Sequence, residues 1–166
     1  MSIREKLSKC FKEGENGERH KGLRKIPISE EKIKGHLNKA IHNFKAMTAF
    51  QKIGFSDWSA SASFYCLYHS LLALIAKEGY ESRNQSCTFA FIEDMIDKEK
   101  ISLSKNELKE IFDADVTEDL EHSNKILDIR ENMQYSVKTA LEQEEFLELK
   151  ERTKALFDKI RKDIEK

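Results

Sequence analysis

His69 and the tyrosines around it are the side chains whose types and spacing are best suited to chemistry. They lie in the stretch SASFYCLYHSLLALIAKEGY, from Ser61 to Tyr80, which is otherwise strongly apolar. A buried imidazole needs partners for both ring nitrogens, and the hydroxyls of Tyr65 and Tyr68 make the same demand. His69 is therefore either a hydrogen-bonded core residue or a group in a water-filled cleft. Several polar side-chain ends on one otherwise apolar helix indicate a polar pocket or an interface between helices.

A second group of chemical side chains lies in ILDIRENMQYSVKTA, from Ile126 to Ala140. Arg130 has apolar neighbours, so it is expected either to pair with a carboxylate or to face an anion such as phosphate. Glu131 and Tyr135 are four residues apart and can meet on one side of a helix. Arg130, Tyr135, His69, Tyr65 and Glu131 are thus the candidates for binding a nucleotide or a phosphate group.

Other site chemistries find less support in the sequence. His36 and His42 are six residues apart and fall on different helix faces, and there is no HExxH sequence, so we expect no metal site. GENGERHKG has the glycines of a phosphate-binding loop without a preceding strand. Cys66 and His69 have the spacing of a nucleophile pair, but a small buried thiol is the favoured interpretation of Cys66.

Composition places the chain among single-domain intracellular proteins. Its 166 residues include 29 basic and 30 acidic side chains, a balance that argues against broad electrostatic binding of nucleic acid. Three scattered cysteines are typical of a reducing compartment. We find neither a cleavable signal nor an apolar run long enough to cross a bilayer, so we expect a cytoplasmic protein without membrane contact.

Helical periodicity runs through the whole chain, and no glycine or proline follows Gly79. The fold class expected is all-α, an antiparallel up-and-down bundle with an extra helix at each end. Residues 1–29 would form a short helix and a polar linker, and residues 30–166 the bundle domain. The expected helices are a short one capped by Ser2, then Glu30–Gln51, one opened by Ser56 and closed by Gly79, Ser86–Asp97, Ser104–Phe112, one beginning at Thr117, and Gln143–Ile164.

Three stretches resemble the HEPN superfamily (higher eukaryotes and prokaryotes nucleotide-binding), in particular its small stand-alone prokaryotic members. The segment SFYCLYHS, Ser63 to Ser70, is similar to the A-Y-Y-A-x-F-H-A helix of that family. ESRNQS and IRENMQY follow in the order in which the family has its next two motifs. The resemblance covers residues 31–140 and leaves the last helix outside.

The resemblance implies a helical bundle that is often a homodimer, binds a nucleotide or RNA, needs no cofactor, and is sometimes encoded beside a nucleotidyltransferase partner in toxin–antitoxin or defence systems. Many members are metal-independent ribonucleases with an arginine followed four to six residues later by a histidine. Arg130 matches the arginine, but Gln134, Tyr135 and Ser136 occupy the histidine's place, and no histidine follows His122. A tyrosine is a poor base at neutral pH.

The function expected is a nucleotide- or RNA-binding or partner-docking module with a degenerate nuclease motif. Arg130 would contact phosphate, and Tyr135 and His69 would line the same cleft. Two alternatives stay open. One is a ribonuclease toxin that combines Arg130 with a histidine from elsewhere, such as His69 or His122. The other is a structural dimer in which the polar cluster sets the helix register.

Overall fold

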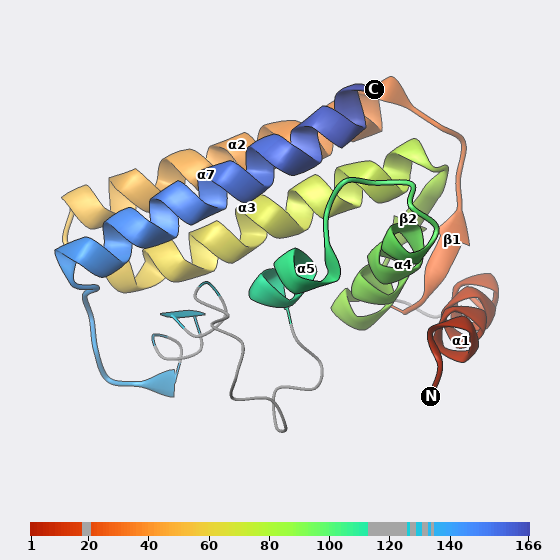
Figure 1. The fold of residues 1–166 in the computed structure, drawn as a ribbon, viewed down its shortest axis with the longest axis horizontal. Helices are drawn as coiled ribbons and strands as arrows, with labels where there is room; N and C mark the ends of the chain where they lie inside the picture. Colours follow the sequence, from red (N-terminus) through yellow and green to blue (C-terminus); the bar gives the residue numbers. More distant parts are fainter. Residues whose placement is uncertain (18–20, 113–125, 127–128, 131–132, 134) are drawn as a thin grey trace.

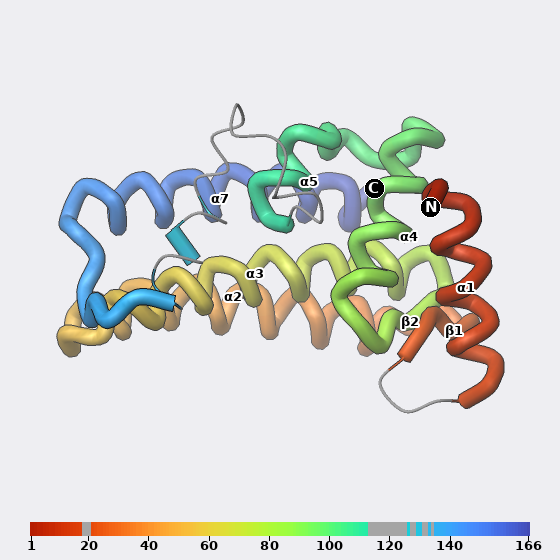
Figure 2. The backbone as a smooth tube through the Cα atoms, turned by 90° about the horizontal axis from the view of Figure 1, so that it is seen from below, coloured from red at the N-terminus to blue at the C-terminus, as the bar shows by residue number. Residues whose placement is uncertain are grey.

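Three long helices form the main body of the protein (Figure 1). They are α2 over Glu30–Lys52, α3 over Ser56–Lys77 and α7 over Gln143–Glu165. α2 and α3 make an antiparallel hairpin, and α7 lies along α3 in the same direction (Figure 2). The computed structural model describes residues 1–17, 21–112, 126, 129–130, 133 and 135–166. The expected all-α bundle is confirmed.

Local capping signals fix the helix ends close to the expected positions. The Ser29 hydroxyl accepts a hydrogen bond from the Lys32 amide at the start of α2. Gly54 ends the α2–α3 turn with a φ of +86°, a conformation that favours glycine. Gly79 has the same φ just beyond α3, as expected for a residue that terminates a helix.

α3 is the central helix because its small and apolar residues face neighbours on two sides. The Ser59 hydroxyl donates to the Met47 carbonyl of α2 at 2.7 Å. The hydroxyls of Ser63 and Thr153, on α7, are 2.6 Å apart. Thr153 gives its own proton to the Leu149 carbonyl, so the Ser63 hydroxyl donates to Thr153. These short contacts let both neighbouring helices approach α3 closely.

α3 is also long and apolar enough to cross a membrane, contrary to the expectation that no apolar run in the sequence reaches that length. Length and composition are its only membrane-like features, and 72% of the apolar window is buried inside the fold. α2 and α7 cover it, so we interpret α3 as the core helix of the bundle.

Two shorter helices, α4 over Gln85–Asp97 and α5 over Lys105–Ile111, pack beside the long ones. Asn84 caps α4, and Ser104 and Glu107 form the expected capping box of α5. Arg152 of α7 donates to Glu110 of α5 at 2.7 Å. The expected helix from Thr117 falls mostly outside the described residues.

Two features tie the N-terminal segment to the bundle, a disulfide and a strand pair. α1, over Ile3–Glu15, has the capping box expected from Ser2 and Glu5. Cys10 of α1 forms a disulfide with Cys87 of α4, whereas the scattered cysteines are typical of a reducing compartment, where disulfides are rare. The expected polar linker contains a strand, β1 over Leu23–Lys25, which pairs antiparallel with β2 over Tyr80–Ser82.

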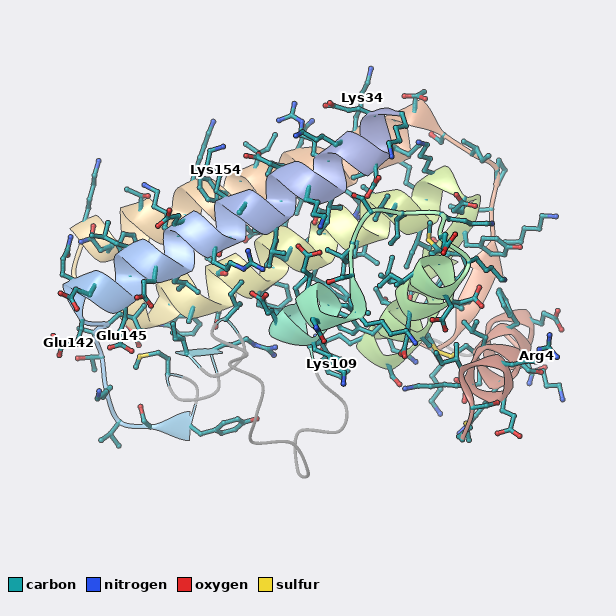
Figure 3. The ribbon with its side chains drawn as sticks, viewed as in Figure 1. Arg4, Lys34, Lys109, Glu142, Glu145 and Lys154 are labelled. Atoms are coloured by element: carbon teal, nitrogen blue, oxygen red, sulfur yellow. A yellow bond between two sulfur atoms is a disulfide. The ribbon has the colours of Figure 1, made fainter. Side chains whose placement is uncertain are left out.

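Charged side chains cover the outer faces of the long helices (Figure 3). Lys34 on α2 and Lys154 on α7 point away from the core, as expected for solvated faces. Glu142 and Glu145 lie together where α7 begins, and the Glu142 amide donates to the Glu145 carboxylate. Acidic groups at this position are stabilised by the positive end of the helix dipole.

Candidate nucleotide-binding site

The polar side chains of α3 separate into two environments. Tyr65 is 43% exposed on the surface of the helix. Tyr68 is half-buried, and its hydroxyl lies 3.0 Å from the Thr88 hydroxyl of α4. Burial raises the pKa of Tyr68, more than its hydrogen bond with Thr88 lowers it. Tyr68 is therefore a structural link between α3 and α4, whereas Tyr65 remains accessible to a ligand.

His69 has a partner that sequence reasoning did not find, His36 of α2. Their Nδ1 atoms are 3.2 Å apart, and the ring planes are tilted by 28°. One Nδ1 must carry a proton and the other must accept it, because two donors or two acceptors would repel. Burial, then the His36 ring and Lys39, lower the pKa of His69 to about 4. His69 is thus a neutral, hydrogen-bonded residue near pH 7.

Cys66 lies on the buried side of α3 and does not form the nucleophile pair that its spacing with His69 allows. The side chain has no exposed surface. Burial raises the pKa of its thiol to about 12. The thiolate required of a nucleophile is therefore scarce at neutral pH, and Cys66 behaves as the small core residue that the sequence favoured.

Arg130 lies over an aromatic ring of α3. The centre of its guanidinium group is 3.7 Å from the centroid of the Phe64 ring, and Phe64 is fully buried. Such a cation–π contact orients a guanidinium group without using its N–H groups, which radiate in the plane of the group. The Phe64 ring therefore supports the guanidinium group of Arg130.

A pocket of about 540 Å³ lies beside this contact and includes Arg130 and Tyr65 in its wall. That volume is in the range of small-ligand sites. Two cations and one carboxylate line the pocket, together with two exposed aromatic rings and several hydroxyl groups. Its lining residues are Asp57, Trp58, Ser61, Tyr65, Arg130, Met133, Ser136, Val137, Lys138 and Thr139.

The structure brings together two of the five candidate residues. Arg130 and Tyr65 share the pocket, and His69 lies one turn beyond Tyr65, where it pairs with His36. Tyr135 is 81% exposed to solvent close to the pocket's last segment. Glu131 lies outside the described residues, as does His122.

The lining residues that sequence reasoning missed include Asp57, Trp58 and Lys138. Trp58 shares a face of α3 with Tyr65 and is 57% exposed, although an aromatic stripe at helical spacing is usually buried. The spacing of seven residues does put both rings on one face, and that face meets the pocket instead of a helix. Two aromatic residues seven positions apart on one helix, together with Arg130, are the sequence pattern that could have indicated this pocket.

Other parts of the described chain offer weaker sites. Within the described residues no three His, Cys, Asp or Glu side chains are grouped to hold a metal ion. A second hollow, of about 590 Å³, lies between α1 and the β1–β2 pair and contains Arg24 and Lys25. Glu15 and the C-terminal end of α1 also face it, so the local field is less favourable for an anion.

Comparison with known proteins agrees with the arrangement of helices, and the matched region is longer than the one that the sequence resemblance covered. The model of the HEPN domain matches residues 33–163, well over half of the chain. This match includes α7, which the sequence resemblance had left outside. A search of curated proteins finds no match to the chain. The chain therefore belongs to the HEPN family.

Proposed function

We propose that the Arg130 pocket binds a nucleotide or a single-stranded RNA segment, and that the protein acts by binding and not by cleavage. The observation that carries this proposal is the guanidinium group of Arg130, whose centre lies 3.7 Å from the centroid of the Phe64 ring at the wall of the pocket. Arginine in this geometry suits phosphate oxygens, which accept several N–H donors at once. Lys138 adds a second positive charge to the same pocket.

Exposed aromatic rings supply the second half of a nucleotide site. Trp58 and Tyr65 lie two helical turns apart on α3 and line the pocket that contains Arg130. Bases stack on such rings with little dependence on sequence. A phosphate bound to Arg130 therefore has flat surfaces nearby for the attached base or for its neighbour along a strand.

Cleavage is not favoured by the groups around Arg130. Ribonucleases of this kind need a group that takes the proton of the 2′-hydroxyl. His69 is tied to His36, and its pKa is lowered to about 4. We therefore favour the binding module over the ribonuclease that the sequence left open.

Partner binding is a further part of the proposal, supported by family membership and by exposed apolar groups. Ile53 and Phe55, in the α2–α3 turn, are 67% and 52% exposed, and Val137, at the pocket, is fully exposed. We propose that this end of the bundle contacts a second copy or a nucleotidyltransferase partner in the cytoplasm, as in toxin–antitoxin or defence systems. Light scattering and co-purification with a neighbouring nucleotidyltransferase test this part.

Trp58 provides the test of ligand binding, because it is the chain's one tryptophan and lines the pocket. Titration with mononucleotides and with a short single-stranded RNA should change its fluorescence in a saturable way. Arg130→Gln should weaken binding about tenfold or more, since it removes charged hydrogen bonds to phosphate. Arg161→Gln, on α7 and paired with Glu165, is the matched control. Equal affinity in both variants contradicts the proposal, and shortened RNA contradicts its non-cleaving form.

A further inference from the structure

The turn between α2 and α3 exposes a group of large apolar side chains at one end of the bundle. Ile53, Phe55 and Trp58 lie within six residues of sequence, and each is more than half exposed. Single exposed apolar residues are common on protein surfaces and need no explanation. A group of large ones in one place is typical of an interaction surface.

The start of α7 is attached to both ends of this turn. The side-chain amide of Gln51 donates to the side-chain oxygen of Gln143 at 3.2 Å, and the Leu141 amide donates to the Ser56 hydroxyl at 2.8 Å. The apolar turn lies between these two attachment points in the sequence. It is therefore adjacent to the first turn of α7, as the ribbon also shows (Figure 1).

Carboxylates give this end of the bundle a negative charge. Glu142 is the N-cap of α7, and Glu144 and Glu145 lie in its first turn. The basic residue in the last turn of α2 is Lys52. The dipole of α7 adds roughly half a positive elementary charge, which does not balance three carboxylates. The apolar turn and its acidic border, the residues Ile53, Phe55, Trp58, Glu142, Glu144 and Glu145, form what we call the turn surface.

The charge of the turn surface distinguishes between the two kinds of partner that the proposed function leaves open. In a closed dimer with two-fold symmetry, the same patch of each subunit faces its copy. The carboxylates of one copy would then approach those of the other, and like charges across an interface oppose association. A partner that combines apolar and basic side chains gains from both parts of the surface.

We infer that the turn surface docks a basic, amphipathic segment of a different protein. This inference rests on the partner-binding part of the proposed function and states the chemistry of that partner. It is independent of nucleotide binding by the Arg130 pocket.

Two synthetic helical peptides of about 18 residues test this inference. Both have a leucine face, and the polar face consists of lysine in one peptide and of glutamate in the other. Fluorescence anisotropy measures binding of each labelled peptide to the full chain. We expect saturable binding of the lysine peptide, at least about tenfold tighter than that of the glutamate peptide, and weaker binding as salt is added.

Paired variants locate the binding on the turn surface. Phe55→Ser should weaken binding of the lysine peptide about tenfold, because it removes exposed apolar area that the peptide would cover. Ile28→Ser is its matched control, since Ile28 is an exposed apolar residue in the segment before α2.

The acidic border has a control of the same design. Glu142→Gln/Glu144→Gln should weaken binding of the lysine peptide and reduce its dependence on salt. Glu30→Gln/Glu31→Gln makes the same change in the first turn of α2 and should leave both unchanged.

Equal binding of the two peptides, or binding of the lysine peptide that Phe55→Ser leaves unchanged, overturns the inference. Self-association of the full chain that Phe55→Ser abolishes, measured by analytical ultracentrifugation, also overturns it, while this end of the bundle remains a partner surface. Absence of both peptide binding and self-association overturns the partner-binding part of the proposed function as well. If a variant does not fold, the two peptides still decide with the wild-type chain.

Discussion

Acidification should destabilise the protein through the histidine pair that joins α2 to α3. Burial, the His36 ring and Lys39 lower the pKa of His69 to about 4, whereas an unfolded chain keeps a value of about 6.5. Between these two values the unfolded chain binds a proton that the folded chain excludes. The free energy of unfolding therefore falls as the pH drops from about 6.5 to about 4, and this contribution then levels off.

The size of the effect follows from the shift and from the exposure of the ring. A pKa lowered by this much corresponds to about 3 kcal/mol of unfolding free energy for a fully buried group. His69 is only half-buried, and water screens it, so the expected loss is about 1–2 kcal/mol. The pKa of His36 is lowered too, by burial and Lys32, with Glu81 acting in the opposite direction. Protonation of His36 therefore also lowers the free energy of unfolding as the pH falls.

Urea unfolding at a series of pH values from about 7.5 to about 4.5 measures this loss. The double variant His36→Asn/His69→Asn should lose about 1–2 kcal/mol less stability over that range than the wild type. His42→Asn is the matched control, since His42 is exposed on the same helix. An unchanged pH dependence in the double variant would refute the reasoning, as would an imidazole NMR titration of His69 near its ordinary pKa.

Three further predictions concern the links between elements. Cys10→Ser/Cys87→Ser should lower the free energy of unfolding by about 4 kcal/mol under non-reducing conditions, measured by urea unfolding, because the disulfide closes a loop with a sequence separation of 77; an unchanged midpoint would contradict the link. Thr153→Val should cost about 1–3 kcal/mol and more than Ser63→Ala, because only the first leaves a buried hydroxyl without an acceptor. Cys66 should resist alkylation in the native protein and react once it is unfolded, as read by mass spectrometry; rapid native labelling would show that the thiol is accessible.

Most helix ends were predictable because the signals that set them are local. Ser2 with Glu5 and Ser104 with Glu107 form capping boxes within four residues of sequence. Gly79 needed only its own conformational freedom to end α3. Such features require no knowledge of tertiary packing, so a single sequence contains them in full.

Contacts between distant segments were not predictable in the same way. The His36–His69 pair joins residues 33 positions apart, and the disulfide joins Cys10 to Cys87. Helical periodicity assigns each residue to a face of its helix, but it does not indicate which other element that face contacts. The β1–β2 pair was missed for a related reason, since three-residue strands have too few residues to show an alternating pattern.

The candidate site was predicted by residue type more successfully than by arrangement. Arginine in an apolar segment indicated either an ion pair or an anion, and the structure adds the Phe64 ring as its support. Trp58 is exposed, although an aromatic stripe at helical spacing is usually buried. Exposure of that stripe depends on where neighbouring helices end, which the sequence of α3 does not contain.

The most direct test of the proposed binding site follows the single indole N–H signal of Trp58 by NMR as single-stranded RNA is added at low salt. We predict that this signal and the backbone amide of Tyr65 shift together and saturate, and that both stay unshifted in Arg130→Gln at the same RNA concentration. Shifts confined to other surfaces of the bundle, or shifts of Trp58 that are the same in Arg130→Gln, would contradict a phosphate-binding role for this pocket.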